Sequence, residues 1–334
     1  MFGGEKMLSS VKNKTWLLLV SFILLLVLSA CNTETSNEEA DQAKEDGQKT
    51  IQIGYQKFGT LNFLKAQETL EKELEPKGFT VTWTEFPGGP QLLEALNVGS
   101  LDFGHTGEAP PIFAQAADAP LIYFANEPKN PKGEAIIVPK DSPIQSVADL
   151  KGKKIALNKG SNVHYLLVKA LEANGLKYED VETSFLPPSD ARAAFEKGVV
   201  DAWVIWDPFL AEAERKTGAR ILVDGTNLVN NREFFLASKE FAEENPEVLD
   251  IIYNEIDKAE TWVSENKNEA AEFLAPQIGM DKETLDIVLE RRTYGIEKIT
   301  DEVINDQQAI ADQFYKLQLI PKEIKTSDAT LETN

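Results

Sequence analysis

Short apolar runs alternate with longer amphipathic segments along most of this chain. Such alternation predicts strands and helices in turn, because strands repeat every two residues and helices every 3.6. The expected strands are 51–55, 80–86, 101–105, 121–124, 135–138, 154–157, 181–186, 202–206 and 220–223. The expected helices are 61–74, 91–98, 111–117, a short one around Val147, 164–174, 191–197 and 209–217, and from Glu240 onward the pattern is almost wholly helical. The whole is typical of an α/β protein with parallel sheets covered by helices.

The alternation forms two similar units of strands and helices, followed by the helical tail. This order predicts two lobes, with a chain that leaves the first lobe and later returns to it. We expect crossings near 138–141 and 231–238, so that 51–137 and 236–334 form lobe 1 and 138–235 forms lobe 2. A length of 334 residues fits two lobes of about 150 each after an N-terminal segment is removed.

The N-terminal segment has the order of residues found in export signals. Lysines precede an apolar run at 16–28 that is too short to cross the ~30 Å hydrocarbon core comfortably. Residues 1–30 are therefore predicted to be a signal peptide. The sequence Leu, Ser, Ala, Cys at its end resembles the bacterial lipobox, and Cys31 is the only cysteine in the chain. We expect lipidation of Cys31, the alternative being an ordinary secretory signal with an accidental cysteine.

The segment that follows is expected to be a lipidated flexible tether at residues 31–50. Residues 32–48 are polar and acidic, without a branched aliphatic or aromatic side chain, and bury too little surface to offset the entropy of ordering. The formal net charge of the chain is −21. This charge argues against nucleic acid and anionic lipid headgroups as partners, since both require a basic surface.

Ligands of open parallel sheets bind beyond the carboxyl ends of the strands, so the loops there hold the candidate site. Hydroxyls and helix N-terminal amides at these loops are suited to an anionic oxygen. From the residues alone, the candidates are Gln56, Gly59 and Thr60, then Thr106, Gly107 and Glu108, then Ser161, then Arg192, and finally Trp206 and Asp207. Several have a structural alternative: Thr60 and Ser161 as plain helix caps, Glu108 turned away from the ligand, Arg192 paired with Asp190 or Glu196, and Trp206 buried in a core.

Catalytic signals are weak by comparison. The two histidines, His105 and His164, are expected in different lobes, and no cluster of His, Cys and carboxylates has metal-ligand spacing. Neither a dinucleotide-binding GxGxxG motif nor a P-loop occurs. The sequence therefore predicts no enzyme, no cofactor and no metal.

Four long stretches carry a resemblance to a known family. TGEAPPIFAQAADAPLIY, KGSNVHYLLVKALE, LPPSDARAAFEKG and DAWVIWDPFLAEAE are similar to the substrate-binding proteins of ABC importers for aliphatic sulfonates, within the nitrate, sulfonate and bicarbonate binding family. The resemblance extends from about Ile51 to the C-terminus. It implies a two-lobed periplasmic-binding-protein fold of type II, with a hinge and C-terminal helices, that closes on one ligand.

The resemblance also implies site residues. The sulfonate would contact Gly59 and Thr60, the Thr106 and Gly107 segment, and the turn of Gly160, Ser161, Asn162 and His164, with Arg192 and Asp207 lining or bracing the cleft. The alkyl part would lie on Phe58, Phe63 or Trp206.

The expected function is that of an extracytoplasmic, monomeric lipoprotein that binds an aliphatic sulfonate and delivers it to an ABC transporter permease with its ATPase. Its anchor to the cell membrane would be the lipid on Cys31. The open alternatives are binding of taurine, nitrate or a pyrimidine thiamine precursor, an enzyme on the same fold, and a sensor domain.

Overall fold

The computed structural model describes residues 49–331, which contain two mixed β-sheets and twelve α-helices. The expected signal peptide at 1–30, Cys31 and the tether up to residue 48 lie outside the described residues. Lys49 and Thr50, assigned above to the tether, instead begin the first strand, where they pair with β2. Within 49–331, no helix is both long enough and apolar enough to span a bilayer.

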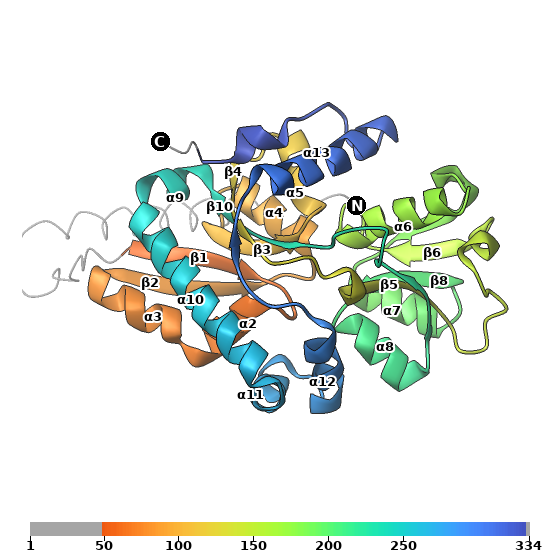
Figure 1. The fold of residues 1–334 in the computed structure, drawn as a ribbon, viewed down its shortest axis with the longest axis horizontal. Helices are drawn as coiled ribbons and strands as arrows, with labels where there is room; N and C mark the ends of the chain where they lie inside the picture. The colour runs from red at the N-terminus through yellow and green to blue at the C-terminus, as the bar shows by residue number, and fades with distance from the viewer. Residues whose placement is uncertain (1–48, 332–334) are drawn as a thin grey trace, which may run out of the picture. The chain divides into compact units, whose positions relative to one another are not determined.

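The first sheet has six strands in the order β11-β4-β10-β3-β1-β2 (Figure 1). These strands are β1 (Lys49–Tyr55), β2 (Phe79–Glu85), β3 (Phe103–Gly107), β4 (Leu121–Asn126), β10 (Glu233–Ser238) and β11 (Glu297–Lys298). β1 runs parallel to β2 and β3, with Ile53 opposite both Trp83 and Phe103. β10 lies between β3 and β4 and is antiparallel to both.

Nine helices belong to this lobe, within the described part of the chain. They are α2 (Thr60–Gln67), α3 (Thr69–Leu74), α4 (Gly89–Asn97), α5 (Pro110–Ala116), α9 (Lys239–Glu244), α10 (Pro246–Glu265), α11 (Lys267–Ile278), α12 (Lys282–Arg291) and α13 (Asp301–Lys316). Side chains alternate between the two faces of a strand, so Phe235 packs with α2, α3 and α10, whereas its neighbours Phe234 and Leu236 pack with α4 and α13. The predicted helix 61–74 is divided at Glu68, whose φ of 54° is left-handed.

The second sheet has five strands in the order β7-β6-β8-β5-β9. They are β5 (Glu134–Val138), β6 (Lys154–Leu157), β7 (Glu182–Phe185), β8 (Ala202–Trp206) and β9 (Arg220–Asp224), and the helices are α6 (Asn162–Ala173), α7 (Pro188–Glu196) and α8 (Phe209–Thr217). Val204 packs towards α6, and Trp203 and Ile205 pack towards α7 and α8. Short 3₁₀ helices complete the lobes at Glu75–Lys77, Pro131–Gly133, Val147–Leu150, Tyr178–Asp180 and Thr326–Ala329.

The sheets are mixed, so the expectation of parallel sheets is wrong for β5 and β10, and the two-residue strand β11 is also antiparallel to its neighbour β4. β5 is antiparallel to β8 and β9, and β10 is antiparallel to β3 and β4. Both β5 and β10 follow a crossing between lobes, so the chain enters the sheet from the other lobe rather than after a covering helix. Their sheet membership also locates the crossings at 127–133 and 225–232, earlier than the expected 138–141 and 231–238.

Candidate functional site

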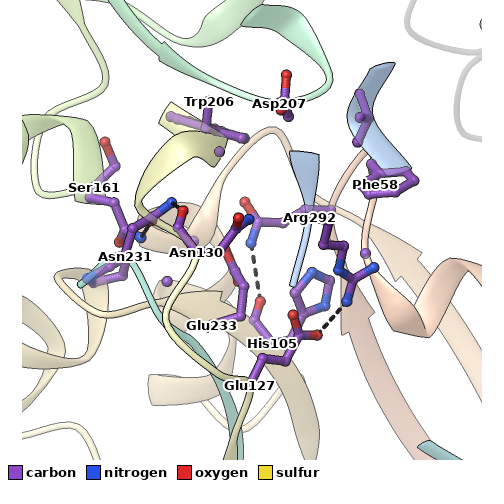
Figure 2. Close-up of a pocket in the computed structure, with 18 residues that line it drawn as sticks. Phe58, His105, Glu127, Asn130, Ser161, Trp206, Asp207, Asn231, Glu233 and Arg292 are labelled. Carbon is purple, nitrogen blue, oxygen red and sulfur yellow. Dashed lines mark hydrogen bonds and ion pairs between the residues drawn. The ribbon is translucent and has the colours of Figure 1, made fainter. Parts of the chain in front are cut away.

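A pocket of about 70 Å³ lies where the two lobes and both crossings meet (Figure 2). Its volume is several times the ~10–15 Å³ that one water needs, so it suits a small polar group. Lobe 1 contributes Gln56, Phe58, Gly59, Gly89, His105, Gly107, Pro110 and Glu233, together with Val288 and Arg292 at and after α12; the crossings contribute Glu127, Asn130, Gly133 and Asn231; lobe 2 contributes Ser161, Asn162, Trp206 and Asp207.

The two lobes are in direct contact at Asn162, the first residue of α6. Its Oδ1 accepts a hydrogen bond from the Ala109 amide of lobe 1 at 3.2 Å, and its Nδ2 donates to Asn231 Oδ1 in the second crossing at 2.6 Å. A Cβ at Gly107 would lie 2.0 Å from Asn162 Nδ2. Position 107 therefore accommodates only a hydrogen where the lobes meet.

The N-terminus of α6 forms one end of the pocket. Ser161 is the N-cap, as predicted, but its hydroxyl donates to Asn158 O at 2.7 Å and accepts no hydrogen bond from the first turn. An N-cap side chain usually satisfies one of the unpaired amides of a helix start. Here that bond is not made, and the helix dipole gives this end of the pocket a partial positive charge.

The opposite end of the pocket holds a buried arginine. Arg292 Nη2 donates to Glu127 Oε1 and Glu260 Oε1, both at 2.7 Å, and to Thr60 Oγ1 at 2.6 Å. Burial raises the pKa of Glu260 to about 7, although Arg292 lowers it, and Glu127 adds to the increase. The carboxylates of Glu127 and Glu260 thus outnumber the Arg292 cation. Arg292 is the one cation among the described residues that line the pocket.

The other ionisable residues of the pocket are also perturbed by burial. Burial raises the pKa of Asp207 to about 7, even though it pairs with Arg291 at 3.3 Å, and its Oδ1 accepts from the Ala211 amide at the start of α8. Burial, with Arg292 nearby, lowers the pKa of His105 to about 4, so its ring is neutral at pH 7. Burial and then Glu127 raise the pKa of Glu233 to about 8.

Seven of the sequence-predicted residues line the pocket together: Gln56, Gly59, Gly107, Ser161, Asn162, Trp206 and Asp207. Phe58 and Trp206, two of the three aromatic residues expected to contact an alkyl chain, also line it. The third, Phe63, is fully buried in the core between α2, α11 and α12. The loops after β1, β3, β6 and β8 thus converge as predicted, because the carboxyl ends of these strands face each other across the pocket.

The other six predicted residues do not line the pocket. Thr60 belongs to the Arg292 cluster, and Thr106 Oγ1 donates to Gly107 O. Glu108 turns towards the second crossing, where it accepts from the Asn231 and Arg232 amides, and burial raises its pKa to about 7. The Gly160 amide donates to His164 Nδ1, and His164 Nε2 forms a hydrogen bond with Tyr178 Oη. Arg192 forms ion pairs with Glu196 and Glu212, both at 2.7 Å.

Sequence reasoning missed the residues that the crossings and the C-terminal helices bring to the pocket. Glu127, Asn130, Asn231 and Glu233 come from the crossings or the strand after them, and Arg292 follows α12. Only Glu127 comes soon after a predicted strand, 121–124, and the loop after that strand was not among the candidate loops. The one available signal was the pair of adjacent arginines at 291 and 292 in a strongly acidic chain. No set of three or more His, Cys, Asp or Glu residues within 49–331 has the geometry of a metal site.

Two α/β lobes joined by two crossings, with a polar pocket between them, define a ligand-binding protein of the periplasmic-binding-protein fold. The chain belongs to the NMT1-like family, whose model matches residues 44–276. It is 42% identical to the "Putative aliphatic sulfonates-binding protein" of Escherichia coli over 84% of this chain and 88% of that protein. It is 34% identical to the Bacillus subtilis protein of the same name, over 95% and 94%. The structure of the alkanesulfonate-binding protein SsuA from Xanthomonas axonopodis pv. citri bound to MOPS matches with a TM-score of 0.81 and 39% identity, over 84% of this chain and 98% of that one.

Proposed function

We propose that this protein is the substrate-binding component of an ABC importer and captures an aliphatic sulfonate between its lobes for delivery to the permease and its ATPase. The observation that carries the proposal is the pocket itself, which lobe 1, lobe 2 and both crossings build together. A ligand that contacts all of these parts stabilises the arrangement in which the lobes meet. The names of the relatives support sulfonate as the ligand class and binding rather than catalysis as the role.

The chemistry of a sulfonate fits the α6 end of the pocket. Its three oxygens share one negative charge at all ordinary pH values, so it requires several donors and little cationic compensation. Asn162 and the first-turn amides of α6 supply donors from lobe 2, and the Gly107 segment approaches from lobe 1. The Ser161 hydroxyl joins them by turning its one proton from Asn158 O to the ligand. Each hydrogen bond to a charged group contributes roughly 1.5–3 kcal/mol. Phe58 and Trp206 supply apolar surface for the alkyl chain.

We also propose that the mature protein is a monomer held outside the cytoplasm by a lipid on Cys31. The support comes from the sequence: an export signal, a lipobox-like Leu-Ser-Ala-Cys and a single cysteine followed by an acidic tether. A tether of this kind would keep the binding protein near its permease while leaving the lobes free to move.

A ligand panel tests the proposed specificity. Alkanesulfonates should raise the thermal stability of the protein, since a ligand at about 100 times its Kd adds about 2.7 kcal/mol to the free energy of unfolding. Taurine, sulfate, nitrate and a pyrimidine thiamine precursor form the comparison set, measured by thermal unfolding. Protection by nitrate or the pyrimidine, with none by a sulfonate, would refute sulfonate binding.

Two alanine variants separate a ligand contact from a surface ion pair. Ser161→Ala should weaken sulfonate binding about tenfold through loss of one charged hydrogen bond, with the melting temperature of the unliganded protein nearly unchanged. Arg192→Ala should leave affinity unchanged and cost at most about 1 kcal/mol of stability, because its partners Glu196 and Glu212 lie outside the pocket. Calorimetric titration of both variants provides the comparison; equal affinities for Ser161→Ala and wild type would remove Ser161 from the site.

A further inference from the structure

The acidic side chains of the pocket differ in whether they have an ion-pair or hydrogen-bond partner. Glu127 pairs with Arg292, and Asp207 pairs with Arg291. Glu233 also lines the pocket, but among residues 49–331 its carboxyl group has neither a hydrogen-bond partner nor an ion-pair partner, and its Oε2 is buried. Buried polar atoms are nearly always bonded, so an unpaired carboxyl in a binding pocket calls for an explanation.

A protonated Glu233 could donate to a sulfonate oxygen, whereas a sulfonate cannot supply the missing partner of an ionised Glu233, since both groups are negative. A ligand N–H group can. The two ends of the pocket differ in charge, as a ligand with a sulfonate and an N–H group requires. Figure 2 shows Ser161 and Asn231 at one end, Arg292 and Glu127 at the other, and Glu233 between them. The α6 end offers donors, while at the Arg292 end the carboxylates outnumber the cation.

We propose that Glu233 is a specificity-determining residue that accepts a hydrogen bond from an ammonium group of the ligand, remote from its sulfonate, so that aminoalkanesulfonates are bound in preference to unsubstituted alkanesulfonates. This inference rests on the proposed function and specifies its substrate class. A site built around an acceptor for a ligand N–H discriminates strongly against an analogue without it, because the acceptor is then left unpaired.

The surroundings of Glu233 hold a proton on its carboxyl group, and ligand binding therefore involves the release of this proton. The titratable groups that face it are Glu127 and Arg292 at the end of the pocket, Glu108 after β3 and Glu134 in β5, whose own pKa is raised well above its usual value by burial. Burial and these acids outweigh the single arginine and keep Glu233 protonated at pH 7 in the unliganded protein. A ligand ammonium favours the ionised carboxylate, so binding releases this proton to solvent, and affinity for an aminoalkanesulfonate should rise from pH 6 to pH 8. Had Glu233 instead donated its proton to a sulfonate oxygen, affinity would fall over the same range.

Calorimetric titration of the full chain with two ligands of matched shape tests the proposal. 3-Aminopropane-1-sulfonate and butane-1-sulfonate differ by an ammonium in place of a methyl group. The wild type should bind the amine about tenfold or more tightly, which is the effect of one charged hydrogen bond. Glu233→Gln should lose this preference and its pH dependence, since an amide carries no charge. Glu240→Gln, an equivalent change at an exposed position of α9, should retain both.

Each outcome is decisive. Equal or tighter binding of butane-1-sulfonate by the wild type overturns the role of Glu233 while the proposed function stands, and this comparison requires no variant to fold. Equal weakening of both ligands by Glu233→Gln, or an affinity for the amine that falls with pH, overturns it as well. If neither ligand binds, the proposed function fails and the inference fails with it.

Discussion

Replacing Gly107 by alanine is expected to weaken sulfonate binding roughly ten- to a hundredfold while the unliganded protein remains folded. The new methyl group would overlap the Asn162 side chain, 2.0 Å from its Nδ2, and overpacking of this kind costs about 1–3 kcal/mol. Alanine at position 107 adds no backbone strain, because Gly107 is not among the left-handed glycines. The three nearest atoms to the new methyl group all belong to Asn162, so the overlap opposes the approach of lobe 2. Affinity measured by calorimetry and compaction measured by small-angle scattering should both decrease.

The double variant Gly107→Ala with Asn162→Ala is the matched control. It removes the side chain that the new methyl group meets, and so it should recover compaction relative to the single Gly107→Ala variant. It also loses the bonds from Asn162 to Ala109 and Asn231, so wild-type affinity is not expected. Binding by the single variant at the wild-type level would show that the lobes do not meet at Gly107 in the liganded state.

Replacing Arg292 by methionine is expected to destabilise the protein by about 3–5 kcal/mol, since removal of one partner of a buried ion pair leaves uncompensated buried charge. Glu127 and Glu260 would then lie together without a cation, and among the described residues only Thr60 and the Gly295 amide would still donate to them. Urea unfolding at pH 7 measures the loss. Arg192→Met, which breaks an exposed pair, should cost at most about 1 kcal/mol.

The loss in Arg292→Met should also depend on pH, in a direction opposite to ordinary acid denaturation. Arg292 lowers the pKa of Glu260, so its removal raises that pKa further above the present value of about 7. A carboxyl whose folded pKa lies above its unfolded value of about 4.5 binds more protons when folded. Its contribution to stability is therefore lost as pH rises through that window and regained as pH falls. Relative to wild type, the variant should gain stability from pH 8 to pH 5; a constant difference would exclude this mechanism.

The local pattern of the chain predicted most elements well. The strand at 202–206 and the helix at 209–217 have the observed bounds, because a continuous apolar run ends at Asp207 and Pro208 and an amphipathic segment follows. The strand at 233–238 was missed. Its apolar run is as clear as that of β8, but it lies in the stretch assigned to a crossing, where alternation with helices gives no guidance.

The site was predicted where it depends on strand ends and missed where it depends on the crossings. Gly107 is the last residue of β3, and Ser161 and Asp207 follow β6 and β8, so that rule placed all three at the pocket. Glu233 and Arg292 reach the pocket from an antiparallel strand and from the end of α12. A rule based on residues that are close in the sequence cannot place such residues in the pocket. The partners Glu127 and Arg292, for example, are 165 residues apart.

Sequence alone determined the alternation of strands and helices, the two-lobed class, the acidic net charge and the strand-end loops that line the pocket, because each of these depends on neighbouring residues. Only the tertiary structure decided which strands turn antiparallel, which lobe contributes each wall of the pocket, and that Arg192 serves a surface ion pair. It also decided that two buried carboxylates neutralise Arg292, while Glu233 has no partner among the residues that the structure describes. Charge balance in a buried site is set by groups distant along the chain, and burial alters their protonation only once the chain has folded around them.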